Sequence, residues 1–231
     1  MPDVNFCCDA PKKKAELRRD RVIAASRKLF IENGFHATGI AQIAKESGIA
    51  VGQLYRDFSA KEEIVAAIVS ADCCTFMAAD SLRTAIAAGD SQLVRNWIHQ
   101  FIMAEDEEDD PDGARLFAEI VAEAGRNARI AAIFRGVDDD VRALLLTALE
   151  MLAPGDAVAE RRAVLADMIG TMALGMLHQQ LIRRDFDGAP LARSFAVSVD
   201  REIDAMRADG AAAQASDDVR DAPRNASGSI P

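Results

Sequence analysis

The sequence predicts an all-α fold, with an N-terminal three-helix, helix-turn-helix domain followed by a larger C-terminal helical bundle. Half of the 231 residues are apolar and only 5% are aromatic. Ala and Leu dominate the apolar share, which favours helices packed on helices. Apolar residues recur at three- and four-residue steps along most of the chain. Gly-, Pro- and Asp-rich breaks divide it into segments of helical length.

These breaks predict four parts. We expect a flexible arm at 1–12, a helix-turn-helix domain at 13–60, a helical body at 61–208 and a disordered tail at 209–231. The tail consists mainly of Ala, Asp, Ser and Gly, with little to bury in a core. No internal repeat and no convincing strand is evident.

In the N-terminal domain we expect helices over 13–33, 40–47 and 51–58, the first of them ended by Gly34. Ser59 and Glu62 have the spacing of a capping box, which predicts a long helix that starts at Ser59 and continues towards Ala87. Further helices are expected over 92–103, 114–125, 128–152, 157–185 and 190–208. The helix expected over 92–103 should carry Leu93, Trp97 and Phe101 on one stripe. Residues 105–112 form an acidic run, which we interpret as a solvated loop.

Charge is divided unevenly along the chain. Residues 11–60 hold ten Lys or Arg and five Asp or Glu, whereas residues 61–231 hold seventeen and thirty. A basic domain joined to an acidic body suits a protein whose basic part binds nucleic-acid phosphates while its acidic part is repelled from them.

Several classes of protein are disfavoured. The sequence contains no run of eighteen apolar residues, so we expect no membrane-spanning helix. Its polar start lacks the apolar core of a secretory signal. The pairs Cys7/Cys8 and Cys73/Cys74 lack zinc-site spacing, so a reduced, cytoplasmic protein is expected. With three scattered His, no H-E-x-x-H and no Gly-rich phosphate loop, we expect no enzyme activity, no cofactor and no metal.

Residues 38–58 have the pattern of a helix-turn-helix. Ala44 is small enough for a helix crossing, and Gly48, four residues later, suits a turn with positive φ. Apolar anchors lie on both sides of this turn: Ile40, Ile43, Ile49, Leu54 and Phe58. The pattern therefore predicts two short helices locked around Gly48.

The face opposite Leu54 and Phe58 should carry Gln53, Arg56 and Asp57 into a DNA major groove. Gln pairs bidentately with adenine and Arg with guanine, whereas Tyr55 and Lys61 suit phosphate contacts. Asp57 would be repelled by phosphates, so it should accept from a cytosine or pair with Arg56 or a nearby Lys. The predicted DNA-binding residues are Thr38, Gln42, Val51, Gly52, Gln53, Tyr55, Arg56 and Lys61.

About fifty residues resemble the N-terminal domain of TetR-family regulators. The resemblance rests on residues 21–30, on Gly34 to Thr38, on the Ile43-Ala44 and Gly48-Ile49 pairs, on Leu54, Tyr55 and Phe58 after Gly52, and on Lys61-Glu62. Three positions depart from the family pattern: Gly39 and Ala50 replace hydroxyl-bearing caps, and Asp57 stands where His, Tyr or Asn is commoner. These departures affect operator contacts more than fold.

The resemblance implies a C-terminal domain that binds a small ligand and forms a homodimer. Apolar stripes with interleaved small residues in 157–185 and 190–208 are consistent with a four-helix interface between two copies. Packing within one subunit is the alternative. Candidate pocket residues for an apolar ligand are Trp97, Phe101, Phe117, Phe134, Met151 and His178, although each also suits ordinary core.

The function these patterns favour is that of a sequence-specific, DNA-binding transcriptional regulator, a homodimeric repressor that a ligand releases from a palindromic operator. The alternative is a TetR-like DNA-binding protein without a small-molecule sensor, acting as an architectural or protein-partnered effector. A redox role for Cys73 and Cys74 is disfavoured because the sequence shows no activating base.

Overall fold

The computed structural model describes residues 14–103, 111–183 and 185–221. Ten α-helices and one short 3₁₀ helix make up the ordered elements of these residues, and none of them forms a strand. The predicted all-α fold is therefore confirmed. None of the helices in the described ranges combines the length and hydropathy needed to cross a bilayer.

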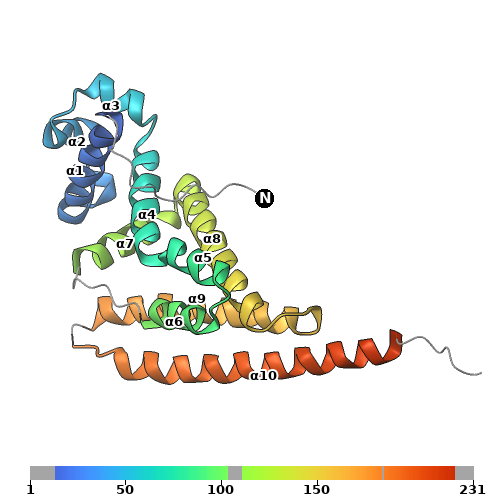
Figure 1. The fold of residues 1–231 in the computed structure, drawn as a ribbon. Helices are drawn as coiled ribbons and strands as arrows, with labels where there is room; N and C mark the ends of the chain where they lie inside the picture. The colour runs from blue at the N-terminus through green and yellow to red at the C-terminus, as the bar shows by residue number, and fades with distance from the viewer. Residues whose placement is uncertain (1–13, 104–110, 184, 222–231) are drawn as a thin grey trace, which may run out of the picture.

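Three helices form the N-terminal domain: α1 (Lys14–Ala37), α2 (Ile40–Ser47) and α3 (Val51–Asp57). They lie together at one end of the molecule (Figure 1). Gly34 interrupts α1 with a φ of 80°, so the last residues of α1 form a separate turn after the break that the sequence predicted. Gly48 ends α2 in the left-handed region, with a φ of 66°.

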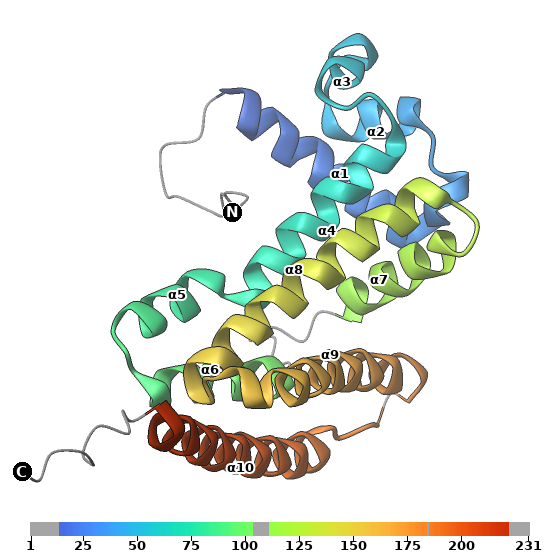
Figure 2. The same cartoon turned by 90° about the vertical axis from the view of Figure 1, so that its right-hand side faces the viewer.

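The body begins with α4 (Lys61–Met77), which leads away from the N-terminal domain, and α5 (Ala79–Ala87). It continues with α6 (Ser91–Met103), α7 (Pro111–Ala124) and α8 (Ala128–Leu152). A 3₁₀ turn, η1 (Asp156–Val158), precedes α9 (Ala159–Ile182) and α10 (Ala189–Asp221). Figures 1 and 2 show α9 and α10 side by side at the end of the molecule opposite α3.

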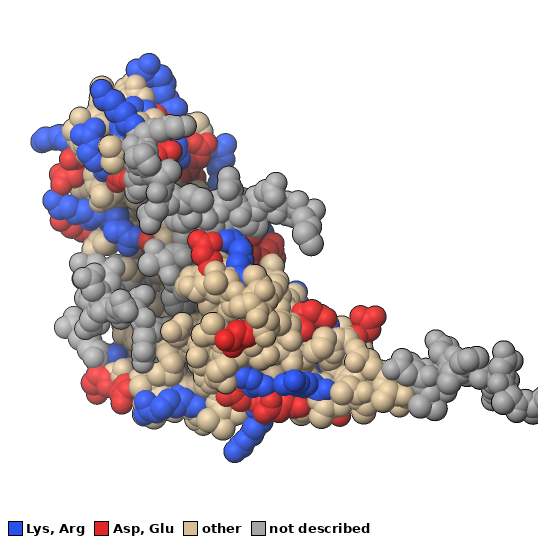
Figure 3. All heavy atoms as spheres, viewed as in Figure 1, with Lys and Arg blue, Asp and Glu red and all other residues tan. Residues whose placement is uncertain are grey.

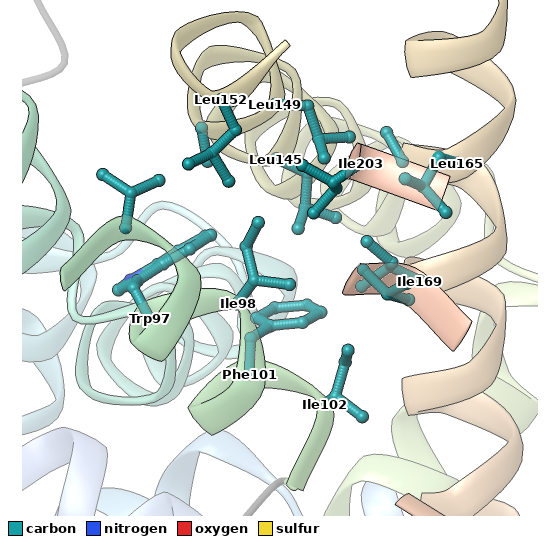
Figure 4. Close-up of a cluster of buried hydrophobic side chains, with 14 of the residues drawn as sticks. Trp97, Ile98, Phe101, Ile102, Leu145, Leu149, Leu152, Leu165, Ile169 and Ile203 are labelled. Carbon is teal, nitrogen blue, oxygen red and sulfur yellow. The ribbon is translucent and has the colours of Figure 1, made fainter. Parts of the chain in front are cut away.

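Two apolar cores hold this arrangement together. The larger joins α6, α8, α9 and α10, and Figure 4 shows Ile98 and Phe101 among the side chains of Leu145, Leu149 and Ile169. The smaller contains the interior of the N-terminal domain and also Leu116, Ile120 and Ile130 of α7 and α8. The N-terminal domain is therefore packed on the body, not merely tethered to it.

Two sequence expectations about α4 are wrong. Its N-cap is Ala60, and Ser59 donates its hydroxyl hydrogen bond to Glu63 (2.5 Å) instead of capping with Glu62. The helix also stops at Met77, because Ala78 has a φ of 41° and Trp97 Nε1 donates to the Met77 carbonyl (2.8 Å). A bonded carbonyl and a left-handed residue end the helix before Ala87.

A third correction concerns the C-terminal helix, which does not end at residue 208. α10 continues to Asp221, into the segment expected to be a disordered tail. Gly210 is buried there, and a Cβ on it would lie 2.8 Å from the Pro154 carbonyl oxygen, so the helix passes close against the start of η1. Arg161 also pairs with Asp209 at 2.6 Å. Ala-rich sequence continues a helix readily once tertiary contacts fix its start.

Other boundaries differ less. α7 begins at Pro111, three residues before the predicted start, and most of the predicted acidic loop at 105–112 lies outside the described residues. The arm at 1–12 and residues 222–231 also lie outside them. In α6, Leu93 is 50% exposed, and Val94 takes the buried position on the stripe with Trp97.

Candidate nucleic-acid interface

The α2–turn–α3 unit has the geometry that its sequence predicts. Ile49 N donates to the Ala44 carbonyl across the turn (3.1 Å), and Phe58 N donates to the Leu54 carbonyl (2.8 Å). The Leu54 and Phe58 side chains are 0% and 1% exposed. Because both are anchored in the core, the orientation of α3 is fixed by packing, and its opposite face points to solvent.

That outer face carries Val51, Gly52, Tyr55 and Arg56. Tyr55 is 53% exposed and Val51 43%, and a Cβ on Gly52 would meet nothing within 4 Å. Arg56 is exposed and leans over its own helix, with Nε donating weakly to the Gly52 carbonyl (3.4 Å). Figure 3 shows Lys and Arg side chains gathered over this end of the molecule. The surface is free to approach a polyanion.

Asp57 was expected to accept from a cytosine or to pair with Arg56 or a nearby Lys, and the expected ion pair is wrong. Its carboxylate accepts from Arg18 of α1 through two bonds, Nε to Oδ2 (2.5 Å) and Nη2 to Oδ1 (2.8 Å). Gln53 Nε2 also donates to Asp57 Oδ1 (3.3 Å), and Arg19 donates to the Asp57 carbonyl oxygen (2.6 Å). The hydrogen bond from Arg18 lowers the pKa of Asp57, against the opposing effect of burial.

The Lys61 ammonium, predicted to contact a phosphate, is engaged within the protein. Its ammonium donates to the carbonyl oxygens of Phe35 (2.5 Å) and Thr38 (3.0 Å) and lies 3.9 Å from the centre of the Phe35 ring. Burial lowers the pKa of Lys61, and the nearby carboxylates of Glu62 and Glu123 oppose that shift. The side chain is directed at the α1–α2 connection.

Two other predicted DNA contacts are engaged within the protein. The Thr38 side chain is buried. Its hydroxyl is within donor distance of two carbonyl oxygens, those of Gly34 (2.9 Å) and Leu29 (3.1 Å). Gln42 is exposed, but its Oε1 accepts from Gly39 N (2.6 Å) and thereby supplies half of a capping box. Thr38 therefore fixes the connection before α2, and Gln42 stabilises the start of α2.

Sequence reasoning missed the contacts that join the N-terminal domain to α7 and α8. Phe35 N donates to Glu119 Oε1 (3.1 Å), and His36 Nε2 lies 2.7 Å from Glu123 Oε2. Asn127 caps α8 and also donates to Glu62 Oε1 (3.0 Å), which lowers the pKa of Glu62. These partners are 65 to 87 residues apart in the sequence, so spacing gave no signal of them.

The six candidate pocket residues do not converge. Trp97 and Phe101 stack at 5.9 Å in the larger core, with Met151 packed against the same core. Phe117 and Phe134 form a T-shaped pair 5.6 Å apart, and Phe134 belongs to the smaller core. His178 is exposed on α9. The interpretation of these residues as one pocket is therefore wrong.

Two open hollows among the described residues are lined by none of those six. One, of about 420 Å³, lies between α9 and α10 around Val164, Met168 and Phe195. The other, of about 510 Å³, lies between α1 and α4 around Ile23, Arg27 and Ile31. In the part of the chain that the structure describes, no group of three His, Cys, Asp or Glu side chains is arranged to hold a metal ion.

Comparison with known sequences identifies the N-terminal domain. Residues 22–68 match the sequence model of the bacterial regulatory proteins of the tetR family, a range that spans most of α1, all of α2 and α3, and the start of α4. The N-terminal domain belongs to the TetR family. This domain therefore carries the helix-turn-helix that the sequence pattern predicted.

Curated relatives also match part of this chain. The transcriptional regulator UidR of Escherichia coli K12 is 38% identical over 64 residues, which cover 28% of this chain and 33% of UidR. The regulator HbdR of an Aromatoleum species is 42% identical over 53 residues, 23% of each chain. The matched part of the chain thus spans about a third or less of the full length of each relative.

Solved structures extend the likeness to the fold of the body. Salmonella enterica GusR superimposes with a TM-score of 0.59 at 24% identity, covering 84% of this chain and 97% of GusR. A TetR transcription regulator from Haloarcula marismortui gives a TM-score of 0.62 at 18% identity, covering 79% and 95%. The C-terminal helices therefore share their fold with the corresponding parts of these two proteins.

Proposed function

We propose that this protein is a sequence-specific DNA-binding transcriptional regulator that reads an operator with α3. The observation that carries the proposal is the outer face of α3. Tyr55 and Arg56 stand exposed there, on a helix whose opposite side is locked by Leu54 and Phe58. A short, rigidly held helix with an exposed guanidinium suits insertion into a major groove.

Of the predicted contacts, we retain Val51, Gly52, Gln53, Tyr55 and Arg56 as the reading surface. Gly52 allows close approach because its position is open. Arg56 suits a guanine and Tyr55 a phosphate. The curated relatives that match part of this chain are named as transcriptional regulators, which supports the same assignment.

We further propose that the active form is a homodimer built on α9 and α10. Six large apolar residues on these helices are each 48% to 62% exposed: Val164, Met168, Leu174, Ile182, Leu191 and Val197. Exposed apolar side chains gathered on two adjacent helices favour burial against a symmetry mate. Two copies of α3, one from each subunit, would read a palindrome with half-sites about 34 Å apart.

Ligand-released repression from this operator, in the cytoplasm where the DNA lies, completes the proposal. The contacts from Glu119 and Glu123 to the end of α1 provide a route by which movement of α7 shifts the N-terminal domain. A ligand that favours a different spacing of the two reading helices would then reduce operator affinity.

The scattered positions of the candidate pocket residues favour the second candidate function, a regulator without a small-molecule sensor. A thermal-shift screen against apolar compounds separates the two. A compound that raises the melting temperature and weakens operator binding supports the sensor. A screen without any such compound, on protein that binds its operator, supports the second candidate.

The DNA-binding proposal is tested by selecting bound fragments from a random duplex pool with the full-length protein. We expect a palindromic motif with two half-sites. Recovery of fragments with no shared motif, at an affinity set by salt alone, would contradict sequence-specific recognition.

A further inference from the structure

An Asp at the last turn of the reading helix is electrostatically unfavourable on two counts. The C-terminus of a helix carries partial negative charge, which repels a carboxylate. DNA phosphates would repel it as well. Asp57 nevertheless occupies this position in α3, with its side chain only 11% exposed. Something within the protein must therefore offset both costs.

Arg18 supplies the compensating charge. Its guanidinium meets both oxygens of Asp57 at 2.5 and 2.8 Å, a bidentate pair that keeps the carboxylate ionised. Arg19 contributes separately to the same end of α3, because it donates to the Asp57 carbonyl and lies 4.2 Å from the centre of the Phe58 ring. One arginine thus holds the side chain, and its neighbour holds the backbone.

The ionised Asp57 has only acceptor atoms, which constrains the third member of the group. Gln53 directs its Nε2 to Asp57 Oδ1 at 3.3 Å. The reversed amide would place Oε1 against a carboxylate, which is repulsive. Gln53 is half-buried, so it lacks the freedom of a fully exposed side chain. Its amide is therefore oriented before any DNA arrives.

We propose that Arg18 and Asp57 are positioning residues that set the base preference of Gln53. With one N–H held by Asp57, Gln53 retains one amide hydrogen and its Oε1. That donor–acceptor pair complements N7 and N6 of adenine. Without the carboxylate the amide rotates freely, and its two hydrogens also suit the N7 and O6 acceptors of guanine. Asp57 thus favours adenine without touching it. This inference rests on the proposed reading role of α3.

The test compares full-length wild type with Asp57→Asn, which has the same shape but presents either an oxygen or an amide to Gln53. Each protein is used to select duplexes from a random pool, and binding is then measured to sites that differ only at the adenine-preferring position. We expect the preference for adenine over guanine to fall about fivefold or more in Asp57→Asn. Arg18→Gln should reduce it in the same direction, and it gives a second reading if Asp57→Asn is poorly folded.

Two controls isolate the positioning role. Arg19→Gln removes a contact to the same helix end without touching the carboxylate, so it should change affinity for all sites equally and leave the base preference intact. In a Gln53→Ala background, Asp57→Asn should have no further effect on that preference.

The possible outcomes distinguish failure of the positioning role from failure of the proposed DNA-binding function. If Asp57→Asn weakens every site alike and leaves the selected motif unchanged, Asp57 has only a structural role and this inference is overturned. If the wild type itself selects no motif, the proposed function fails, and the positioning role fails with it. If the wild type selects a motif whose base preferences do not respond to Gln53→Ala, the positioning role alone is overturned.

Discussion

Replacing Lys61 with Met should destabilise the N-terminal domain without changing its contacts with DNA. Lys61 bridges the Phe35 and Thr38 carbonyls at 2.5 and 3.0 Å and lies over the Phe35 ring. Charge-assisted hydrogen bonds contribute about 1.5 to 3 kcal/mol each, and an exposed cation–π contact about 0.5 to 1 kcal/mol. Desolvation of the ammonium opposes these contributions, so we expect a net loss of about 2 kcal/mol.

The loss is measured by urea unfolding followed by circular dichroism, with Lys45→Met as the matched control. Lys45 is exposed on α2, so its removal should change the free energy of unfolding by less than about 0.5 kcal/mol. The salt dependence of operator binding is then measured on folded Lys61→Met protein. We expect the slope of the logarithm of affinity against the logarithm of salt concentration to match that of the wild type.

The opposite pattern would refute this reasoning. If Lys61→Met kept the wild-type stability and reduced the magnitude of the salt slope by about one, Lys61 would be a phosphate ligand. That result would restore the expectation from the sequence and contradict the inward placement of the ammonium.

Three further predictions address acid stability, the larger core and the dimer. The pKa values of Asp57, Glu62 and Glu63 are lowered in the fold, chiefly by hydrogen bonds from Arg18, Asn127 and Ser59 respectively. Their stabilisation is therefore present above the unfolded pKa values and is lost as the pH falls through the folded ones. Urea unfolding should show stability decreasing below about pH 4, less steeply in Asp57→Asn; equal slopes would contradict this. Trp97→Phe removes the donor to the Met77 carbonyl and should cost about 1 to 2 kcal/mol in the same assay, whereas an unchanged midpoint would exclude that bond from the stability of the core. Met168→Glu places a charge on a side chain 51% exposed on α9 and should convert dimer to monomer in sedimentation velocity, while Ser81→Glu on α5 should not; a Met168→Glu dimer would place the interface elsewhere.

The sequence predicted the local features of the fold well because they depend on local chemistry. The bounds of α2 and α8 agree with the predicted ones, since Gly48 and Asn127 mark an end and a start through their own backbone and side-chain preferences. The break at Ala78 had no such signal. It depends on Trp97, twenty residues further along the chain, which reaches the Met77 carbonyl.

The candidate site was predictable in outline only. Periodicity separated the anchors Leu54 and Phe58 from the outer face that carries Arg56. It did not show that Asp57 pairs with Arg18, 39 residues earlier, or that Lys61 turns inward to carbonyls 23 and 26 residues earlier. The first is an ion pair and the second a pair of charge-assisted hydrogen bonds to backbone carbonyls. Their partners are set by the packing of α1 against α3 and α4. Residue spacing along the sequence therefore could not predict these partners.

Arg56 offers the most direct test of the claim that the outer face of α3 reads bases. The measurement repeats the selection from a random duplex pool with full-length wild type and Arg56→Ala, and compares the two motifs position by position. We predict that the variant selects the same palindrome with specificity relaxed at one position in each half-site, at a cost of about 1 to 3 kcal/mol for the preferred base. An unchanged motif, or an equal loss of affinity for every sequence, would contradict base reading by this face of α3.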